Sequence, residues 1–590
     1  MASFKIGISM AGAISAGAYT AGVLDFLTEA LDAWEKAKDN NEDVPRHDVC
    51  IEVLAGASAG GMCAAISAVM LQEEFEHIDD TRKRNTSNRF YESWVNRIDI
   101  EELLKTDDIK KSRSVVSLLD SAIISTIAEY ALTLKAPRQT PRGYVSPHLT
   151  LFLSLTNLGG IPYSLNSAAP GSIEETTFFY GDRIRFETTH TRPASLLEKT
   201  VRKLDLTTPG KGGGWDVLQT AAMATGAFPV FLAPRLLERC VSEYLPPHWL
   251  SVTSAATGTP PPVPPNFPKD FPQPFVTLNA DGGVTNNDPF NYAHDYLASL
   301  EPVSKDGHDQ QKPLEADRSV ISIAPFPTTR QFKPISNAET KFSIFSVFSE
   351  LFSALVSQSR FFGESLSDIM TGTTFSRFVI APSDDELAKK HLAGEGPRRE
   401  QPPALQCASL GAFGGFFERE FRAHDYALGR RNCQKFLSSS FVLPEKNAII
   451  AEGLAALDPA ARKIVYERFK RPAPGTYAHT AEVLQRANIP LPSEQQEGGD
   501  IWFPLIPLCT ESLREELPHV ERATISHERV HLIVTFILKR SKEVISCLID
   551  LVPSRRFQWF LRFGQPFIRW LARRPLTEAL IKQLGDSYQK

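Results

Sequence analysis

Residues 54–61 read LAGASAGG and join an apolar run at 48–55 (DVCIEVLA) to a helical pattern at 60–72 built on Ala, Met, Ile, Val and Leu. The apolar run predicts a buried strand, and the small residues between strand and helix predict a tight turn. A strand, a turn and a helix in this order are typical of the layers of an α/β fold.

The same order occurs at the N-terminus. Residues 4–10 (FKIGISM) predict a first buried strand, and residues 18–37 carry apolar side chains at a helical spacing. Further strands are predicted at 149–157, 176–182, 275–280 and 319–326. The alternation of strands and helices predicts an α/β architecture with a mainly parallel central sheet.

Ser58 is the first candidate for chemistry, because Gly56 and Gly60 lie two positions away on either side. A sharp strand-to-helix turn exposes a serine hydroxyl and points backbone N–H groups and the positive end of the helix dipole at it. Such a turn crowds its flanks, which explains the need for glycine there. Two interpretations stay open at this point: a nucleophile, or a close contact of helix and sheet that needs small residues.

The second candidate follows the strand predicted at 275–280, where Asp281, Gly282 and Gly283 form a DGG run. An aspartate at the carboxyl end of a strand of a parallel sheet lies where α/β proteins bind ligands. Its carboxylate could accept the proton of a serine hydroxyl. An isolated DGG run also fits a structural Asx turn.

These motifs together resemble the patatin-like phospholipase family. The resemblance covers roughly residues 4–327 and includes AAMATGAFPVFLAP at 221–234. It implies a three-layer α/β/α fold and a Ser-Asp dyad, without histidine, that hydrolyses lipid or phospholipid esters. By this similarity Ser58 is the nucleophile and Asp281 the general base of a phospholipase A-type esterase that works through an acyl-enzyme. No metal ion or other cofactor is implied, and no nucleic acid is expected as a partner.

The loop after the first strand departs from that family. Family members carry a run similar to SGGGxRG, whose backbone amides form the oxyanion hole, whereas residues 11–17 here read AGAISAG. The expected donors are the N–H groups of Gly12, Ala13 and Ile14. A residue other than glycine costs about 1 to 2 kcal/mol more at positive φ, and a β-branched one costs more still. A catalytically weak or inactive membrane-binding or scaffold protein is therefore the alternative.

An ordinary Ser-His-Asp α/β-hydrolase is a less favoured alternative. The serine is only 58 residues from the start, which leaves little room for the strands that usually precede such a turn, and no histidine stands in a distinctive context. The histidines that follow Asp281 are His294, His308, His391, His424, His479, His519, His527 and His531. The dipeptide His424-Asp425 lacks the partner ligands of a metal-dependent phosphohydrolase. Glu418 and Arg422 lie four residues apart on the same stretch, so a charged helix face is expected.

The pattern changes after about residue 330. Residues 1–330 are expected to form the acyl hydrolase domain, with a proline-rich insertion at 251–275, and residues 331–590 a mainly helical C-terminal region. Eight of the fifteen residues from Pro260 to Pro274 are proline, which excludes a helix or a central strand there. Helical patterns lie at 341–362 and 411–437.

A basic aromatic tail at 553–590 ends the chain. Residues 539–590 hold 11 Lys and Arg against 4 Asp and Glu, although the formal net charge of the chain is −5. The segment Arg555–Arg574 contains six arginines, six Phe or Trp and no acidic residue. Aromatic rings at the headgroup level and arginines on anionic phosphates predict an anionic membrane surface as partner. The alternative is a pair of C-terminal helices docked on the body by their aromatic face.

The composition is that of a globular protein, with 42% hydrophobic and 23% charged residues. No apolar run approaches the ~20 residues of a spanning helix, and the N-terminus lacks the pattern of a signal peptide. Seven scattered cysteines without a CxxC pair predict neither a disulfide framework nor a cysteine zinc site. We therefore expect a cytoplasmic protein, either free or peripheral at the inner membrane face.

Overall fold

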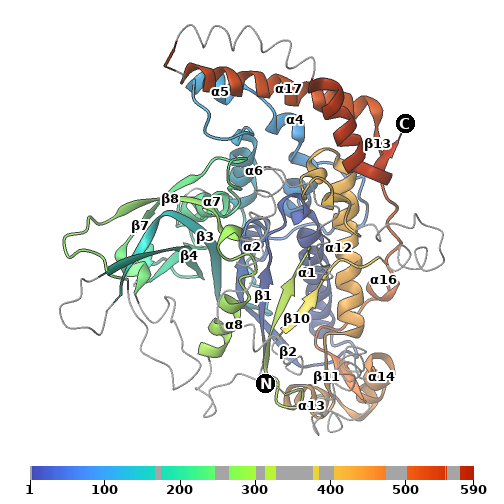
Figure 1. Cartoon of the computed structure of the whole chain (residues 1–590). Coiled ribbons are helices and arrows are strands. Elements are labelled where there is room, and N and C mark those ends of the chain that lie inside the picture. The colour runs from blue at the N-terminus through green and yellow to red at the C-terminus, as the bar shows by residue number, and fades with distance from the viewer. Residues whose placement is uncertain are drawn as a thin grey trace, which may run out of the picture.

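The computed structural model describes residues 3–165, 175–198, 200–210, 212–245, 265–300, 312–326, 377–384, 404–472, 501–551, 553–554 and 572–589. A ten-stranded sheet forms its centre, with the order β10-β9-β1-β2-β3-β4-β6-β5, and β8 pairs with β3 and β7 (Figure 1). Three predictions lie wholly or mostly outside the described residues: the helix at 341–362, most of the proline-rich insertion, and most of the segment 555–574.

One half of the sheet is parallel, as predicted. Every neighbouring pair among its five strands runs in the same direction. The strands are β1 (Ser3–Met10), β2 (Asp48–Gly56), β3 (Val145–Leu165), β9 (Arg318–Ile323) and β10 (Arg377–Ile380). The apolar runs predicted as strands at 4–10, 48–55, 149–157 and 319–326 all fall here, because both faces of these strands are covered.

The other half is largely antiparallel and forms an arm at the left of Figure 1. It contains β4 (Glu175–Thr189), β5 (Leu197–Glu198), β6 (Val201–Asp205), β7 (Arg235–Arg239) and β8 (Phe275–Asp281). The expectation that Asp281 ends a parallel strand was wrong, because β8 runs antiparallel to β3. β3 continues past the end of β2, so Leu153 pairs with Gly56 and Leu155 with Asp281. Asp281 therefore still reaches the carboxyl edge of β2.

Helices cover both faces of the parallel half and complete the three-layer α/β/α fold. α8 (Phe290–Ser299) lies on one face, where a Cβ atom added to Gly7 would come within 3.2 Å of Ala293 and Leu297. α1 (Gly17–Asp39) and α2 (Ala59–Met70) lie on the other face. Shorter elements around them are α3 (Arg89–Tyr91), a π-helical segment (Glu92–Arg97), α4 (Ile100–Leu103), α5 (Asp107–Ser112), α6 (Ala122–Leu132) and α7 (Trp215–Thr225).

Helix α12 (Arg419–Ser439) of the C-terminal region packs directly on α1. The two backbones approach closely at two glycines: a Cβ atom on Gly22 would lie 2.0 Å from the carbonyl oxygen of Tyr426, and one on Gly429 would lie 2.2 Å from that of Tyr19. A single hydrophobic cluster contains side chains of β1, α1 and α12. The described part of the C-terminal region thus shares the core of the N-terminal region.

The helix predicted at 411–437 begins later than expected. Residues 409–417 instead form an irregular segment with a 3₁₀ turn (Gly414–Phe416), and Leu410, Gly411 and Ala412 all have positive φ. α12 is also not a charged surface helix, because Arg422 and His424 are buried and Arg422 donates to backbone carbonyls. The prediction of a charged face there was wrong.

The other described residues of the C-terminal region are mainly helical. α17 (His527–Asp550) and the helical residues 572–584 share a second hydrophobic cluster with α4, in which Leu580 and Leu584 are buried. Further elements are β11 (Val442–Pro444), α13 (Ala448–Ala455), α14 (Pro459–Phe469), β12 (Trp502–Pro504), α16 (Glu511–Arg514), β13 (Ile525–Ser526) and β14 (Tyr588–Gln589). No helix in the described part of the chain is long and apolar enough to cross a membrane.

Candidate active site

Ser58 occupies the turn between β2 and α2, where it is the N-cap residue of the helix with φ 53° and ψ −127°. This is a strained conformation for a residue with a side chain, and such strain is concentrated at functional sites. Both flanking glycines are sterically required: a Cβ atom on Gly56 would lie 2.5 Å from the carbonyl oxygen of Gly60, and one on Gly60 would lie 2.2 Å from that of Met10. The turn presents the serine hydroxyl at the start of the helix.

Ser58 and Asp281 meet although 223 positions separate them in the chain. The Ser58 hydroxyl donates a hydrogen bond of 2.6 Å to Asp281 Oδ2, and the Gly283 N–H donates one of 2.7 Å to Oδ1. The backbone of Asp281 is held in turn, because Thr156 Oγ1 donates to its carbonyl oxygen at 2.7 Å. Both carboxylate oxygens thus have a donor, and the serine proton points at a base.

Burial raises the pKa of Asp281 from its ordinary value to about 7, while the hydrogen bonds from Ser58 and Gly283 act in the opposite direction. The side chain is almost fully buried. A general base works best when its pKa lies near the working pH. This carboxylate can therefore be ionised near neutral pH and still bind a proton taken from Ser58.

The loop after β1 lies directly against Ser58. A Cβ atom on Gly12 would lie 2.9 Å from Ser58 Cβ and 2.3 Å from Asn287 Oδ1, so only glycine fits there. The Gly12 N–H already donates to the carbonyl oxygen of Asn287 at 3.1 Å and is not free to bind an oxyanion. The N–H groups of Ala13 and Ile14 have no acceptor among the described residues. Of the three expected donors, these two have their N–H groups available.

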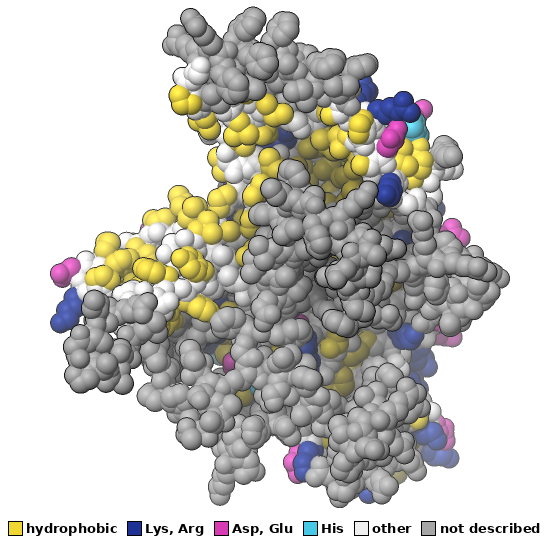
Figure 2. All heavy atoms as spheres, viewed as in Figure 1, with side chains coloured by type: hydrophobic (Ala, Val, Ile, Leu, Met, Phe, Trp, Pro, Cys, Tyr) yellow, Lys and Arg dark blue, Asp and Glu magenta, His cyan; other side chains and the backbone are white. Residues whose placement is uncertain are grey.

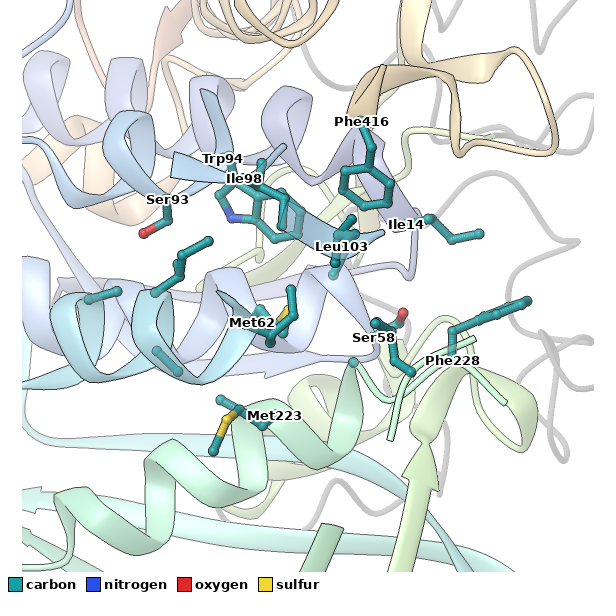
Figure 3. Close-up of a pocket in the computed structure, with 18 of the residues that line it drawn as sticks. Ile14, Ser58, Met62, Ser93, Trp94, Ile98, Leu103, Met223, Phe228 and Phe416 are labelled. Atoms are coloured by element: carbon teal, nitrogen blue, oxygen red, sulfur yellow. The ribbon is translucent and has the colours of Figure 1, made fainter. Parts of the chain in front are cut away.

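An elongated apolar pocket begins at Ser58 (Figure 3). Apart from Ser58, Ser93 and Gly226, every residue that lines it is apolar. Ala59, Met62 and Ile66 line it from one face of α2, a stretch of about 10 Å at 1.5 Å per residue. Most of the remaining wall comes from the π-helical segment, α4, α6, α7 and the segment at 409–417. Its shape and lining suit an extended hydrocarbon chain.

The structure offers no support for a catalytic histidine among the described residues, since no imidazole there is hydrogen-bonded to Ser58 or Asp281. His424 Nδ1 donates to Asp425 Oδ1 at 2.8 Å, and the Asp425 carboxylate also accepts two backbone N–H groups. That pair is part of the buried packing of α12. His308, His391 and His479 lie outside the described residues.

One motif was not recognised in the sequence: residues 527–531 read HERVH, which matches the HExxH pattern of zinc sites. It lies at the exposed start of α17, and the Nε2 atoms of His527 and His531 are 2.7 Å apart. No group of three or more metal-ligating side chains occurs in the part of the chain that the structure describes. The motif therefore lacks a third protein ligand there.

Two supporting residues were also missed. Thr225 Oγ1 accepts the Ser58 N–H at 3.0 Å, and Asn287 accepts the Gly12 N–H. Thr225 lies within the family-like segment at 221–234, and Asn287 follows the DGG run by four positions. Their proximity to the motifs is the only signal that a single sequence contains for them, because both act through contacts between distant segments.

Two comparisons with known proteins found similarities. Residues 8–294, which include Ser58 and Asp281, match the family model described as patatin-like phospholipase. The chain is also 34% identical over 465 residues to the uncharacterized protein y4iI of Sinorhizobium fredii. That match covers 74% of this chain and 64% of the relative, so the chain spans a little less than two thirds of that protein. On this chain the similarity extends well beyond the residues that match the family model.

Proposed function

Residues 8–294 belong to the patatin-like phospholipase family, and from this premise we propose that the protein hydrolyses lipid esters through an acyl-enzyme on Ser58. The observation that carries the proposal is the 2.6 Å hydrogen bond from Ser58 to Asp281 at one end of an apolar pocket. A packing serine has no need of a buried carboxylate, and a buried carboxylate is costly to keep without a role. The pair is therefore assigned as a catalytic dyad.

The reaction begins when Asp281 accepts the Ser58 proton while Ser58 Oγ attacks the ester carbonyl carbon. The carbonyl oxygen becomes an oxyanion, which accepts hydrogen bonds from the N–H groups of Ala13 and Ile14 and lies near the positive end of α2. Asp281 returns the proton to the leaving alcohol. Water then attacks the acyl-enzyme, with Asp281 again taking the proton, and the fatty acid leaves.

The acyl chain of the substrate is assigned to the apolar pocket. Residues on α2 line it for about 10 Å beyond the nucleophile, which suits a medium or long chain rather than an acetyl group. Burial of such a chain gains about 0.8 kcal/mol per CH₂ group. Long-chain esters of glycerolipids or phospholipids are therefore the proposed substrate class.

We also propose that the protein works at an anionic lipid surface in the cytoplasm. Near the pocket, Val116, Leu118 and Val230 expose their apolar side chains. Figure 2 shows further apolar side chains over the arm of β4, β7 and β8. On β7 and β8 the side chains of Leu236 and Val276 are exposed. Arginines of the segment Arg555–Arg574 would contact lipid phosphates.

The decisive experiment compares lipid hydrolysis by the wild type, Ser58→Ala and Asp281→Asn, with Ser67→Ala as control. Ser67 is a buried serine of α2, the helix that begins after Ser58, and its hydroxyl donates to the carbonyl oxygen of Cys63. Loss of the nucleophile or base is expected to lower kcat at least 10³-fold, and labelling by a fluorophosphonate should require Ser58. A wild type that binds vesicles but neither hydrolyses lipid nor labels would instead support the inactive scaffold.

A further inference from the structure

We infer that the C-terminal region completes this active site: residues 409–417, here called the clamp segment, hold the oxyanion loop in its working shape through Ser15. Ser15 directly follows Ala13 and Ile14 and is fully buried. Its N–H and its hydroxyl both donate to the carbonyl oxygen of Ala412, at 3.2 Å and 2.5 Å. The hydroxyl also accepts the N–H of Gly415 at 3.1 Å. Three hydrogen bonds thus join segments about 400 positions apart.

Backbone strain explains why such a contact is needed. Ile14 has φ 49°, a conformation that favours glycine and is most costly for a β-branched residue. A strained residue of this kind persists only where its surroundings determine its conformation. The related family carries glycines in this loop, which adopt positive φ freely. In this chain the hydrogen bonds between Ser15 and the clamp segment hold the loop in this conformation instead.

The clamp segment is itself anchored on α12. Arg422 donates to the carbonyl oxygen of Gly415 at 2.6 Å and to that of Val95 at 3.0 Å. The Asp425 carboxylate accepts the N–H groups of Gln406 and Cys407 at 2.8 Å and 2.9 Å. Because α12 packs on α1 through close backbone contacts, the position of the clamp segment is fixed relative to the turn that carries Ser58.

Close fit at Gly415 makes the contact specific. A Cβ atom on Gly415 would lie 2.5 Å from Ser15 Oγ and 2.3 Å from Cys407 Sγ. Both neighbours are buried, so neither can move away freely. Any larger residue at 415 would push Ser15 and, through it, the N–H groups of Ala13 and Ile14.

The clamp segment also forms part of the pocket, which links the two halves of the site. Phe413 and Phe416 line the pocket, and in Figure 3 Phe416 lies on the same side of Ser58 as Ile14. The ring of Phe413 contacts those of Phe228 and Phe231, with centroids 5.8 Å and 4.9 Å apart. One segment thus contacts both the oxyanion loop and the wall that would hold the acyl chain.

Ser15 and Gly415 are accordingly positioning residues, which act on the transition state through the loop and do not touch the substrate. This inference rests on the proposed function. Its prediction differs from a purely structural role, because loss of the Ser15 hydrogen bonds alone should weaken binding of the oxyanion and leave binding of the acyl chain unchanged.

The test compares Ser15→Ala with the control Ser67→Ala, using a soluble medium-chain ester, a trifluoromethyl ketone that forms a tetrahedral adduct, and a free fatty acid. Rates are divided by the concentration of active sites, which is measured by fluorophosphonate titration. Unfolded protein then does not lower the calculated kcat. We expect Ser15→Ala to lower kcat about 10- to 100-fold and ketone affinity by a similar factor, with KM and fatty acid affinity within twofold of wild type.

Gly415→Ala provides a second variant that keeps the Ser15 hydroxyl and should show the same pattern. The inference is overturned if both variants retain wild-type kcat, or if fatty acid affinity falls as much as ketone affinity. These outcomes are distinct from failure of the proposed function, in which the wild type itself would neither hydrolyse esters nor label at Ser58.

Discussion

The Asp281 carboxylate, whose residue is only 2% exposed, accepts a hydrogen bond of 2.6 Å from the Ser58 hydroxyl. Burial raises the pKa of Asp281 to about 7. One contact therefore determines three measurable properties: the ability of Ser58 to attack, the pH range in which it can do so, and a stability cost that the protein bears for keeping an ionisable group inside.

Activity should rise with pH through about 7. Only the ionised carboxylate can accept the Ser58 proton, and burial raises the pKa of Asp281 to about 7. Below that value the ionised fraction falls about tenfold per pH unit, and kcat/KM should fall with it. The measurement is kcat/KM for a soluble ester from pH 5 to 9. A profile that is flat, or that falls as the pH rises through 7, would contradict the role of Asp281.

Asp281→Asn should abolish activity and yet stabilise the fold above neutral pH. Burial raises the folded-state pKa of Asp281, so between pH 4 and 7 the folded state holds a proton that the unfolded state has lost. Stability of the wild type therefore falls as pH rises through that window, by an amount on the order of 4 kcal/mol for a shift of this size. Asparagine does not titrate and keeps a group that can pair with Ser58 and Gly283.

The check is thermal unfolding of both proteins at pH 5 and pH 8. The variant should gain in Tm relative to wild type at pH 8, and the gain should shrink at pH 5. An equal Tm difference at the two pH values would show that the carboxylate is not held in an unfavourable environment.

Gly429→Ala should destabilise the protein although alanine is the better helix former. The added Cβ would lie 2.2 Å from the carbonyl oxygen of Tyr19, so α12 must move away from α1. We expect the free energy of unfolding to fall by about 2 kcal/mol or more, although the higher helix propensity of alanine alone would raise it by about 1 kcal/mol. Ser438→Ala, near the exposed end of the same helix, is the control and should change little. Unfolding by urea measures both, and a stabilised Gly429→Ala would show that the helices do not cross there.

Local patterns were enough to predict the parallel half of the sheet and the two segments whose side chains, Ser58 and Asp281, meet. The turn at Ser58 and the run at Asp281 each contain glycines that the local backbone geometry requires, so both could be recognised in the sequence. In the structure the side chains of Ser58 and Asp281 are hydrogen-bonded to each other. The antiparallel direction of β8 could not be predicted, because it depends on how β8 pairs with the part of β3 that continues past the end of β2. The sequence of either strand taken alone does not show which strand it will pair with or in which direction.

Contacts between distant segments account for the other differences. Gly12 was one of the three expected oxyanion donors, but its N–H donates to the backbone carbonyl oxygen of Asn287. A β-branched residue such as Ile14 was expected to be costly in this loop. The structure shows that Ser15 joins the loop by hydrogen bonds to Ala412, about 400 positions away in the chain. Helical periodicity likewise extended α12 into residues 411–418, where backbone conformations with positive φ interrupt it.

Ile66→Trp should shorten the range of acyl chains that the protein accepts. Ile66 lines the pocket from α2, about 10 Å from Ala59 along the helix axis. An indole there would block the inner part of the pocket and leave the part beside Ser58 open. We expect kcat/KM for a 4-nitrophenyl hexadecanoate to fall at least tenfold, with that for the butanoate within twofold. Ile66→Val, which removes one methyl group, is the control; equal loss on both esters would refute an acyl chain in this pocket.

The membrane role of the segment Arg555–Arg574 is best tested by removing charge. Deletion of the tail from residue 553 would also remove Leu580 and Leu584, which are buried in the cluster beneath α17. That deletion would unfold part of the second cluster and could lower vesicle binding for reasons unrelated to lipid contact. Replacement of Arg555, Arg556, Arg562 and Arg569 by glutamine leaves those leucines in place.

Each arginine near an anionic surface contributes about 1 kcal/mol, so we expect the fourfold variant to bind vesicles containing phosphatidylglycerol at least tenfold more weakly. Binding to phosphatidylcholine vesicles and hydrolysis of a soluble ester should stay unchanged. A matched variant neutralises four exposed basic residues elsewhere, Lys36, Arg82, Lys446 and Lys463. Equal losses in the two variants would mean that net charge alone governs binding, because a specific contact through the tail must depend on where the charges lie.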